Sequence, residues 1–319
     1  MNEIDINRLD LRTASGLEIW GWEVAGYLFL GGIAAGIMVL SVLAVHGAGA
    51  GAPSRWLRRL PFAAPVLVSV GMLLLFLDLE AKEHVHRFYL ALRLTSPMSW
   101  GAWILVLIYP ATVLLGIARM TDGETARLGA WRPARLARIG AVVSRARRWA
   151  RGRIGALERA NAVLGVALGL YTGLLLGTLE ARPLWNTSLL APLFLVSGLS
   201  TGAAVMMLFP LHGDEHDRLR GLDLLAIGGE VVVLALFLID RATSGAAASE
   251  AAARFLGGDL TAAFWSLVVV AGLVVPALLE VIEARRHSGR ALAAPFLVLI
   301  GGFALRWIIV SGGQQGPLA

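Results

Sequence analysis

Acidic and phenolic side chains stand at the ends of the long apolar runs of this chain, where they could exchange protons with a bound molecule. Glu23 and Tyr27 lie four residues apart in the first run, which reads WGWEVAGYLFLGGIAAGIMVL over residues 20–40. On a helix this spacing places both side chains on one face. A carboxylate beside a phenol accepts protons and forms hydrogen bonds, which suits one end of a quinol. Glu23 and Tyr27 are therefore the first candidate site residues.

Further polar and aromatic residues fall at the same depth in the neighbouring runs. Asp78 and Glu80 close the second run, and Trp100 and Trp103 open the third. An ionisable side chain costs about 2.5–3.5 kcal/mol at the centre of a membrane, so several at one depth indicate a site. Asp78 is a second candidate proton acceptor, and either tryptophan could pack against a bound ring. An aromatic belt at the membrane surface is the alternative for the tryptophans.

A second set of acids lies along the sixth run. Glu230 stands near mid-membrane in this run, too deep for its carboxylate to reach water. Asp223 lies two helical turns to one side of it, and Asp240 lies on the other side. These three residues predict a ladder of protonatable groups that forms a proton pathway. A protonated, hydrogen-bonded Glu230 with a structural role is the alternative.

The composition argues against a metal centre or a haem in this chain. Cysteine is absent from the sequence, which excludes disulfides and thiolate-bound iron–sulfur clusters. A transmembrane b-type haem takes its histidines from deep within facing helices. The six histidines instead stand at run ends or in loops, at His46, His84, His86, His212, His216 and His287. We predict no metal site, so any cluster must belong to a partner subunit.

The overall composition is that of an integral membrane protein. With 57% hydrophobic residues, 16% charged residues and a mean hydropathy of +0.71, the 319-residue chain is too apolar for a soluble domain. A helix needs roughly 20 apolar residues to cross the hydrocarbon core. The qualifying runs are 22–46, 60–79, 98–119, 160–180, 188–211, 219–240, 262–283 and 291–310. The predicted fold class is an all-α membrane protein with eight transmembrane helices.

The basic residues are distributed unevenly among the connections. Those after the first, third, fifth and seventh runs hold 19 Lys and Arg residues, against 8 in the tail and the other connections. Basic residues mark the cytoplasmic side, so both termini are predicted on the outer, periplasmic side. The polar first twenty residues indicate an external tail and not a cleavable signal peptide. The net charge of +6 then reflects topology and lipid contact, and no nucleic-acid binding is predicted.

The second half of the sequence resembles the first. LGGIAAG at 30–36 matches VSGLSTG at 196–202, and LLFLD ending at Asp78 matches LFLID ending at Asp240. Units of four helices keep one orientation, so we predict two parallel four-helix-bundle repeats, residues 1–180 and 181–319. The small-xxx-small pairs Gly32/Gly36 and Gly198/Gly202 are predicted to bring helices close together.

A long basic connection, residues 119–159, interrupts the repeat after the third run. It holds eleven arginines and an apolar stripe formed by Leu136, Ile139, Val142, Val143 and Trp149. This pattern predicts an amphipathic helix on the inner leaflet, in contact with membrane lipids. Docking of a cytoplasmic protein is the alternative.

Four motifs occur in order along the sequence: WGWEVAGYLFLGGIAAG in the first run, LDLE closing the second, SPMSWGAW opening the third, and RW-x-x-V-x-G-G-Q at 306–314. Together they resemble the NrfD/PsrC family, the membrane subunits of polysulfide-reductase-like complexes. The resemblance spans nearly the whole sequence. It places a polar pair of the family on Glu23 and Tyr27, the end of its second helix on Asp78 and Glu80, and a tyrosine of its fourth helix on Tyr171.

The resemblance implies a quinone-binding subunit, for menaquinone or ubiquinone, of a respiratory oxidoreductase complex in the bacterial inner membrane. Its site would face the periplasm and exchange electrons with a four-cluster ferredoxin-like iron–sulfur subunit, which in turn contacts a molybdopterin enzyme or a multihaem cytochrome. One departure is DLEAKEHVHRFYLALRLTSPMSWG, where many family members read roughly DLGRP. This stretch adds His84 and His86 to the rim, where they could accept protons or contact the partner.

Two other functions remain open from the sequence. A proton-translocating or transporter module without its own redox site could use the same repeats, with Glu230 at its centre. A passive anchor for a soluble enzyme is the third possibility. The leading hypothesis is electron transfer between a quinol and an iron–sulfur partner, with coupled proton transfer. It differs from both alternatives because it requires a cavity for a quinone ring among the first three runs.

Overall fold

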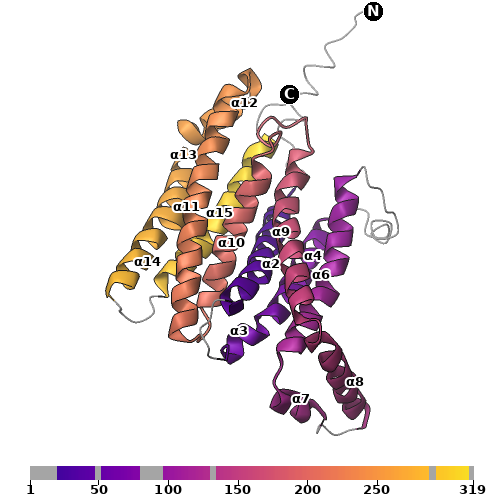
Figure 1. Ribbon diagram of the computed structural model, residues 1–319. Helices are drawn as coiled ribbons and strands as arrows, with labels where there is room; N and C mark the ends of the chain where they lie inside the picture. Colours follow the sequence, from indigo (N-terminus) through magenta and orange to yellow (C-terminus); the bar gives the residue numbers. More distant parts are fainter. Residues whose placement is uncertain (1–19, 47–51, 80–95, 130–133, 287–291, 316–319) are drawn as a thin grey trace, which may run out of the picture.

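The computed structural model describes residues 20–46, 52–79, 96–129, 134–286 and 292–315, and within these ranges every regular element is a helix (Figure 1). Eight spans there are long and apolar enough to cross a membrane. They are formed by α2 (Trp22–His46), α4 (Ala63–Asp78), α6 (Pro97–Arg119), α9 (Ile154–Gly177), α10 (Leu190–Met207), α11 (Gly213–Thr243), η3 (Phe264–Val274) continued by α14 (Val275–Arg286), and α15 (Ala293–Gln315). The prediction of an all-α protein with eight transmembrane helices is confirmed.

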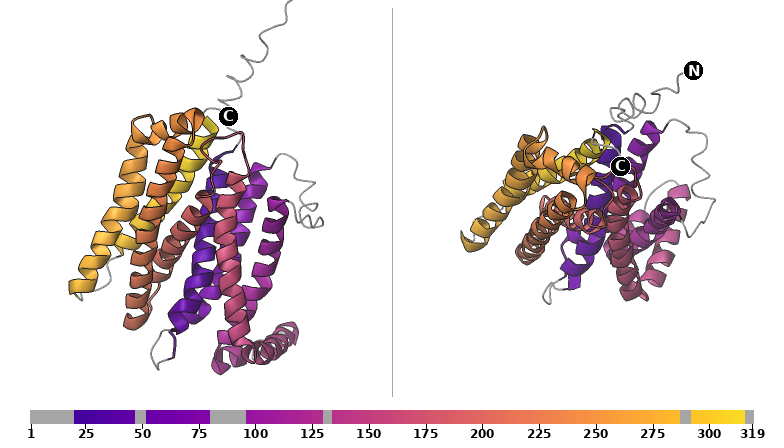
Figure 2. Two further views of the ribbon diagram at one scale, coloured as in Figure 1. Left: turned by 45° about the horizontal axis from the view of Figure 1, so that its top comes forward. Right: turned by 90° about the horizontal axis from the view of Figure 1, so that it is seen from above.

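Shorter helices lie at the two ends of the bundle. They are α3 (Arg55–Arg59) and η1 (Leu60–Phe62) before α4, α7 (Asp122–Gly129) and α8 (Ala134–Arg151) between α6 and α9, and α12 (Ala246–Leu256) and α13 (Thr261–Ala263) after α11. The helices α7 and α8 lie at one end, and α12 lies at the opposite end with the end of α15 (Figure 1, Figure 2). The sequence did not predict α12.

The helix α11 begins earlier than its apolar run, because its first turn is capped. The His212 backbone N–H donates to Glu215 Oε2 at 3.1 Å, which satisfies a backbone donor that a helix start leaves unpaired. The other carboxylate oxygen of Glu215 accepts from the Ser54 backbone N–H at 2.6 Å. This contact fixes the start of α11 beside α3, so the helix extends well beyond the apolar segment.

The helices α2 and α10 cross at glycines in the centre of the molecule. A Cβ atom on Gly36 would overlap the carbonyl oxygen of Gly198, and a Cβ on Gly202 would lie 2.6 Å from the Gly36 Cα. Only glycine permits backbones to approach this closely. The predicted role of the Gly32/Gly36 and Gly198/Gly202 pairs in close helix packing is confirmed.

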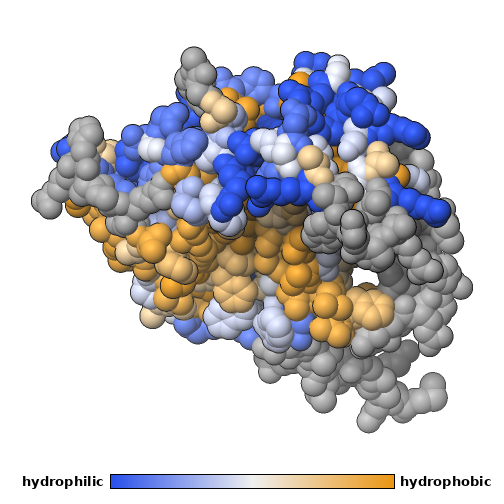
Figure 3. All heavy atoms as spheres, turned by 90° about the horizontal axis from the view of Figure 1, so that it is seen from below, coloured by the Kyte–Doolittle hydropathy of each residue, from blue (hydrophilic) through white to orange (hydrophobic). Residues whose placement is uncertain are grey.

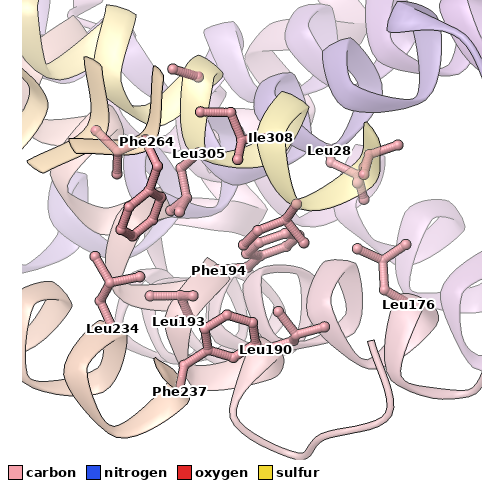
Figure 4. Close-up of a cluster of buried hydrophobic side chains, with 14 of the residues drawn as sticks. Leu28, Leu176, Leu190, Leu193, Phe194, Leu234, Phe237, Phe264, Leu305 and Ile308 are labelled. Carbon is pink, nitrogen blue, oxygen red and sulfur yellow. The ribbon is translucent and has the colours of Figure 1, made fainter. Parts of the chain in front are cut away.

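Four helices pack on this central pair, and α6 and η3 pack outside them. In the first half α2 contacts α4 and α9, and α6 contacts α9; in the second half α10 contacts α11 and α15, and η3 contacts α15 (Figure 2). A hydrophobic cluster joins the halves around Leu28, Phe194, Phe237 and Phe264, with Leu305 and Ile308 from α15 (Figure 4). The site regions described below are therefore built on a packed framework.

The helix η3 is a π-helix, a wide form that is rare in proteins. Pro276 lies just beyond it and has no backbone N–H to donate to the Gly272 carbonyl, so the regular α-helical ladder cannot run through this point. Gly272 also packs against Gly301 of α15, where a Cβ on Gly301 would overlap the Gly272 Cα. The irregular turn thus coincides with a close helix crossing.

The long basic connection folds into the helical hairpin α7–α8. Arg147 donates to the Met120 carbonyl at 2.8 Å and pairs with Asp122, and Arg59 of α3 pairs with Glu124 at 2.6 Å. The Arg147 guanidinium lowers the pKa of Asp122 below its ordinary value of 3.8. The predicted helix is confirmed as α8, with Ile139, Val142 and Trp149 exposed.

The side chain of Leu136 lies outside the described residues, so the stripe is seen only in part. Viewed from the end that carries α7 and α8, hydrophilic residues gather along one side and a hydrophobic surface extends beside them (Figure 3). This segregation of polar and apolar surface is typical of a protein that meets both water and lipid.

Candidate functional site

A cavity of about 290 Å³ lies among α2, α4, α6 and α9, near the end of the bundle where α2 begins. Its walls are largely apolar and include Val24, Leu28, Met72, Leu75, Leu105 and Leu176. The lining also includes residues with polar groups, Trp20, Tyr27, Asp78, Tyr171 and Thr178. An apolar cavity with a few converging polar groups is the usual form of a small-molecule site.

Of the two predicted site residues on α2, Tyr27 lines the cavity and Glu23 does not. Tyr27 is buried and lines the cavity, and its ring packs against Gly71 of α4. Glu23 is half-buried, does not line the cavity, and folds back over Gly21. The carboxylate therefore lies one helical turn beyond the phenol, toward the end of the bundle, and not in the cavity wall.

Tyr171 of α9 enters the cavity from the opposite side. The residue is 6% exposed, and its phenol lies directly against Gly101 of α6, where any Cβ would overlap the ring. The family resemblance had placed a site tyrosine here, and the structure locates it in the same cavity as Tyr27. Gly101 belongs to the SPMSWGAW motif, so the motif supplies the space that the phenol occupies.

The other predicted residues of this site occupy different positions. Asp78 ends α4, is half-buried and lines the cavity. Trp100 and Trp103 lie on the exposed face of α6 and do not line it. The cavity is instead lined by Met98, Ala102 and Leu105, whose spacing of four and three residues defines the opposite face of the helix. Glu80, His84 and His86 lie outside the described residues.

The rim of the cavity is fixed by residues that sequence reasoning did not assign to it. The Trp20 ring stacks on Trp185 with centroids 5.3 Å apart and planes at 19°. Its backbone N–H donates to Gln314 Oε1 at 2.6 Å, and Gln314 Nε2 donates to the Trp20 carbonyl at 2.8 Å. Trp185 in turn donates to the Ile309 carbonyl and packs on Gly313. The GGQ part of the last motif thus positions Trp20.

The connection between α9 and α10 crosses this end of the bundle and is held by charged side chains. Buried Arg182 contacts the Gln314 carbonyl, and its burial lowers its pKa. Thr187 donates to Asp240 at 2.7 Å, and Arg241 binds the same carboxylate at 2.7 Å. Asp240, predicted as part of a proton pathway, is therefore engaged in anchoring this connection.

Arg306 and Glu230 occupy the centre of the molecule. Arg306 is fully buried and donates to Ser197 Oγ at 3.1 Å and to the Leu28 and Gly302 carbonyls at 3.3 and 2.7 Å. Glu230 is 3% exposed, interacts with Ser197, and faces the Arg306 charge. The sequence predicted a role for Glu230 but did not pair it with Arg306 of α15, because residue spacing along the chain does not show which helices pack together.

Asp223 forms a further buried group, with Glu280 of α14 and Ser200 of α10. Sequence reasoning predicted Asp223 and missed Glu280, which stands near the end of its run and so resembled a surface charge. Among the described residues, no group of three or more His, Cys, Asp or Glu side chains is placed to hold a metal ion. Two paired polar sites thus lie in the second half, at Glu230–Arg306 and Asp223–Glu280, whereas the cavity lies in the first half.

Comparison with known proteins identifies the family. The profile described as Polysulphide reductase, NrfD, matches residues 12–317. The chain belongs to the NrfD polysulphide reductase family. It is 33% identical to Protein NrfD of Escherichia coli strain K12 over 309 residues, which cover 93% of this chain and 95% of the relative. The resemblance inferred from the four motifs is confirmed.

Other relatives of this NrfD-family protein have names that refer to reductases. A polysulfide reductase chain of Wolinella succinogenes is 30% identical over 312 residues, covering 93% of this chain and 94% of the relative. A selenate reductase subunit of Mesobacillus selenatarsenatis is 26% identical over 326 residues, covering 93% and 74%. The family match and the eight apolar spans identify a multi-pass membrane protein related to subunits of reductases.

Proposed function

We propose that this protein is the quinone-binding membrane subunit of a respiratory oxidoreductase complex, and that it exchanges electrons with an iron–sulfur partner near the periplasmic face. The observation that carries the proposal is the cavity between α2, α4, α6 and α9. Its volume of about 290 Å³ is close to the lower end of the range for ligand sites, roughly 300–1,000 Å³. Two phenols and one carboxylate meet there in an apolar wall.

The cavity also offers a route from the lipid. Phe76 of α4 and Met98 of α6 both line it, and they are 41% and 49% exposed. A headgroup inside could therefore keep its apolar tail among lipid chains. Because quinones are carried in the membrane, such a lateral opening favours a quinone over a water-soluble ligand.

The side chains have distinct roles in this proposal. A quinol supplies two electrons and two protons when it is oxidised. Tyr27 and Tyr171 hold the headgroup oxygens through their hydroxyls, and Asp78 receives a proton at its carboxylate. Glu23, one turn beyond Tyr27, passes protons outward from the rim. We therefore expect Asp78→Asn to slow quinol oxidation more than Glu23→Gln.

The same proposal includes two parallel repeats and an outward-facing site. The repeats, residues 1–180 and 181–319, are supported by the α2–α10 crossing, where Gly36 meets its sequence counterpart Gly202. The orientation is supported by the basic α7–α8 hairpin, which lies at the end opposite the cavity. The partners proposed are a four-cluster ferredoxin-like subunit and a molybdopterin or multihaem cytochrome subunit, with menaquinone or ubiquinone as the cofactor, in the bacterial inner membrane.

A second candidate function is proton translocation through the second half of the chain. The observation in its favour is the Glu230–Arg306 pair, buried where a charge is costly unless it serves a purpose. It is compatible with the first function, because quinol oxidation releases protons. If the protein binds no quinone, however, proton translocation would be its main function, and the protein would be a transporter.

A cavity-filling substitution tests the proposal. Ala102 lines the cavity, whereas Val106 lies four residues further along α6 and is 43% exposed on the lateral surface. We expect the purified complex to retain quinone, Ala102→Phe to lose it, and the matched control Val106→Phe to keep it. Quinone is measured after solvent extraction. Retention in both variants, or no quinone in the unmodified protein, would refute the proposal.

The orientation is tested separately, because the absence of native cysteine allows single-cysteine labelling. Gly123 of α7 has open space around it, and Glu250 of α12 is exposed at the other end. An impermeant maleimide added to intact spheroplasts should label Glu250→Cys and should reach Gly123→Cys only after permeabilisation. The reverse pattern would place the cavity on the cytoplasmic side.

A further inference from the structure

Two carboxyl groups are buried together between α11 and α14, in the half of the chain that does not form the cavity. Asp223 is 0% exposed and Glu280 is 1% exposed. Their side chains interact directly, and Ser200 of α10 lies beside Asp223. This contact joins three helices in the buried interior of the bundle.

The oxygens of this pair have no ordinary donor. Within the described part of the protein, neither oxygen of Asp223 and neither oxygen of Glu280 accepts a hydrogen bond of normal geometry, and the Ser200 hydroxyl is also unpaired by that standard. Two ionised carboxylates in contact would repel each other, and each would lose its hydration without compensation. One proton placed between them removes the repulsion and supplies the missing donor. We propose that Asp223 and Glu280 share a single proton and form a proton-binding site within the membrane.

The charges around the pair come from three helices. Arg220 of α11 attracts Glu280, and Glu283 of α14 repels it. Glu230 lies two turns along α11 and repels Asp223, and Arg306 of α15 faces Glu230. From α10, the uncharged Ser200 lies beside Asp223. The Arg220 guanidinium also binds the exposed Asp217 at 2.8 Å, so it does not by itself neutralise the pair. A shared proton removes one of the two buried negative charges.

Hydroxyl groups of α10 connect this pair to the centre of the molecule. Ser200 lies beside Asp223, and Ser197 and Thr201 line the small space that holds Glu230. Asp223 and Glu230 are about 10 Å apart along the helix axis, which these hydroxyls span. In this arrangement the acid O–H of the Asp223–Glu280 pair gives its proton to the hydroxyl of Ser200. The hydroxyls of α10 pass a proton along, and the Glu230 carboxylate accepts one. The pair then takes up a new proton from water at the α7–α8 end.

A hydrogen bond of Arg306 connects this polar centre to the wall of the cavity. The Arg306 guanidinium donates to the Leu28 carbonyl at 3.3 Å, and Leu28 follows Tyr27 in the sequence and lines the cavity itself. The existence of the shared proton does not depend on quinone binding. Its use as the inner entry for protons rests on the proposed function.

Infrared spectroscopy of the purified full-length protein tests the pair. A shared proton predicts a carboxylic-acid C=O band that moves in heavy water. We expect Asp223→Asn and Glu280→Gln each to remove or shift this band, and the double variant to remove no further band. Each amide can donate to the carboxylate that remains, so the single variants are expected to fold, and thermal unfolding checks this. The control Asp214→Asn, an exposed acid of the same helix, should leave the band unchanged.

The outcomes separate this inference from the proposed function. A band that is unchanged in either single variant would show that the other carboxyl holds its own proton, and would overturn sharing. Carboxylate bands that respond to sodium ions, with no acid band, would identify a cation site and would also overturn it. Quinone content is measured in the same samples. Retained quinone with an unresponsive band refutes only the pair, whereas a responsive band without quinone refutes only the proposed function.

Discussion

The phenol of Tyr171 on α9 lies against Gly101 on α6, and a Cβ atom at position 101 would occupy the place of the ring. This contact sets the position of one of the two tyrosines in the cavity. One side of its ring packs on α6, and the residue also lines the cavity. A glycine at 101 is therefore a requirement of the site and not only of helix packing.

The first prediction concerns this contact. Gly101→Ala should push the Tyr171 ring into the cavity and weaken quinone binding by about tenfold, which corresponds to about 1.4 kcal/mol. Binding is measured by titrating quinone against the fluorescence of Trp20 and its neighbours. In a Tyr171→Ala background, where no ring remains to be displaced, Gly101→Ala should have little further effect. Equal losses in both backgrounds would mean that Gly101 acts through helix packing alone.

The second prediction separates the cavity phenols from a surface phenol. Tyr27→Phe and Tyr171→Phe each remove one hydroxyl and should weaken quinone binding by about 3–10-fold, the range for one neutral hydrogen bond. Tyr109 of α6 is the control, because its hydroxyl bonds to Ser69 at 2.9 Å outside the cavity. Tyr109→Phe should bind quinone normally. A loss there as large as at Tyr27 would indicate a general effect on the bundle.

The sequence predicted the helices well, because length and hydropathy alone decide which segments can span a membrane. All eight predicted runs overlap observed spans. The predicted helix boundaries were wrong where specific contacts extend a helix. Glu215, for example, caps the start of α11 and binds Ser54. Such a contact joins residues 161 positions apart and leaves no local pattern in the sequence.

The candidate site was predicted only in part, for a related reason. Tyr27 and Asp78 line the cavity as expected, whereas Trp100 and Trp103 point away from it. Helical periodicity could have separated the tryptophans from Ala102, since they fall on different faces of α6. No periodicity could have paired Glu230 with Arg306, because that pairing depends on how α11 and α15 pack.

The third prediction tests this buried pair. Arg306→Met leaves Glu230 as an uncompensated charge in the interior and should cost about 3–5 kcal/mol in the free energy of unfolding. Glu230→Gln should cost less, because Arg306 keeps acceptors on Leu28, Ser197 and Gly302. The double variant Arg306→Met/Glu230→Gln should be more stable than Arg306→Met alone. Thermal unfolding in detergent, followed by circular dichroism, measures all three, and additive losses would argue against a charge pair.

The last prediction concerns the acid stability of the α7–α8 hairpin. The Arg147 guanidinium lowers the pKa of Asp122, so the ionised form is favoured in the folded hairpin. The contribution of this pair is therefore fully present above the ordinary aspartate value of 3.8 and is lost as the pH falls through the lowered pKa. Because Gly123 has open space around it, a spin label on Gly123→Cys reports the motion of the α7 backbone, which should stay slow at neutral pH and increase only below that value. In an Asp122→Asn background the label should already be mobile at neutral pH, whereas Asp214→Asn should behave as the unmodified protein. Because α7 also contacts α3 through Glu124 and Arg59, a label that stays immobile in Asp122→Asn would show that this second ion pair holds the hairpin by itself.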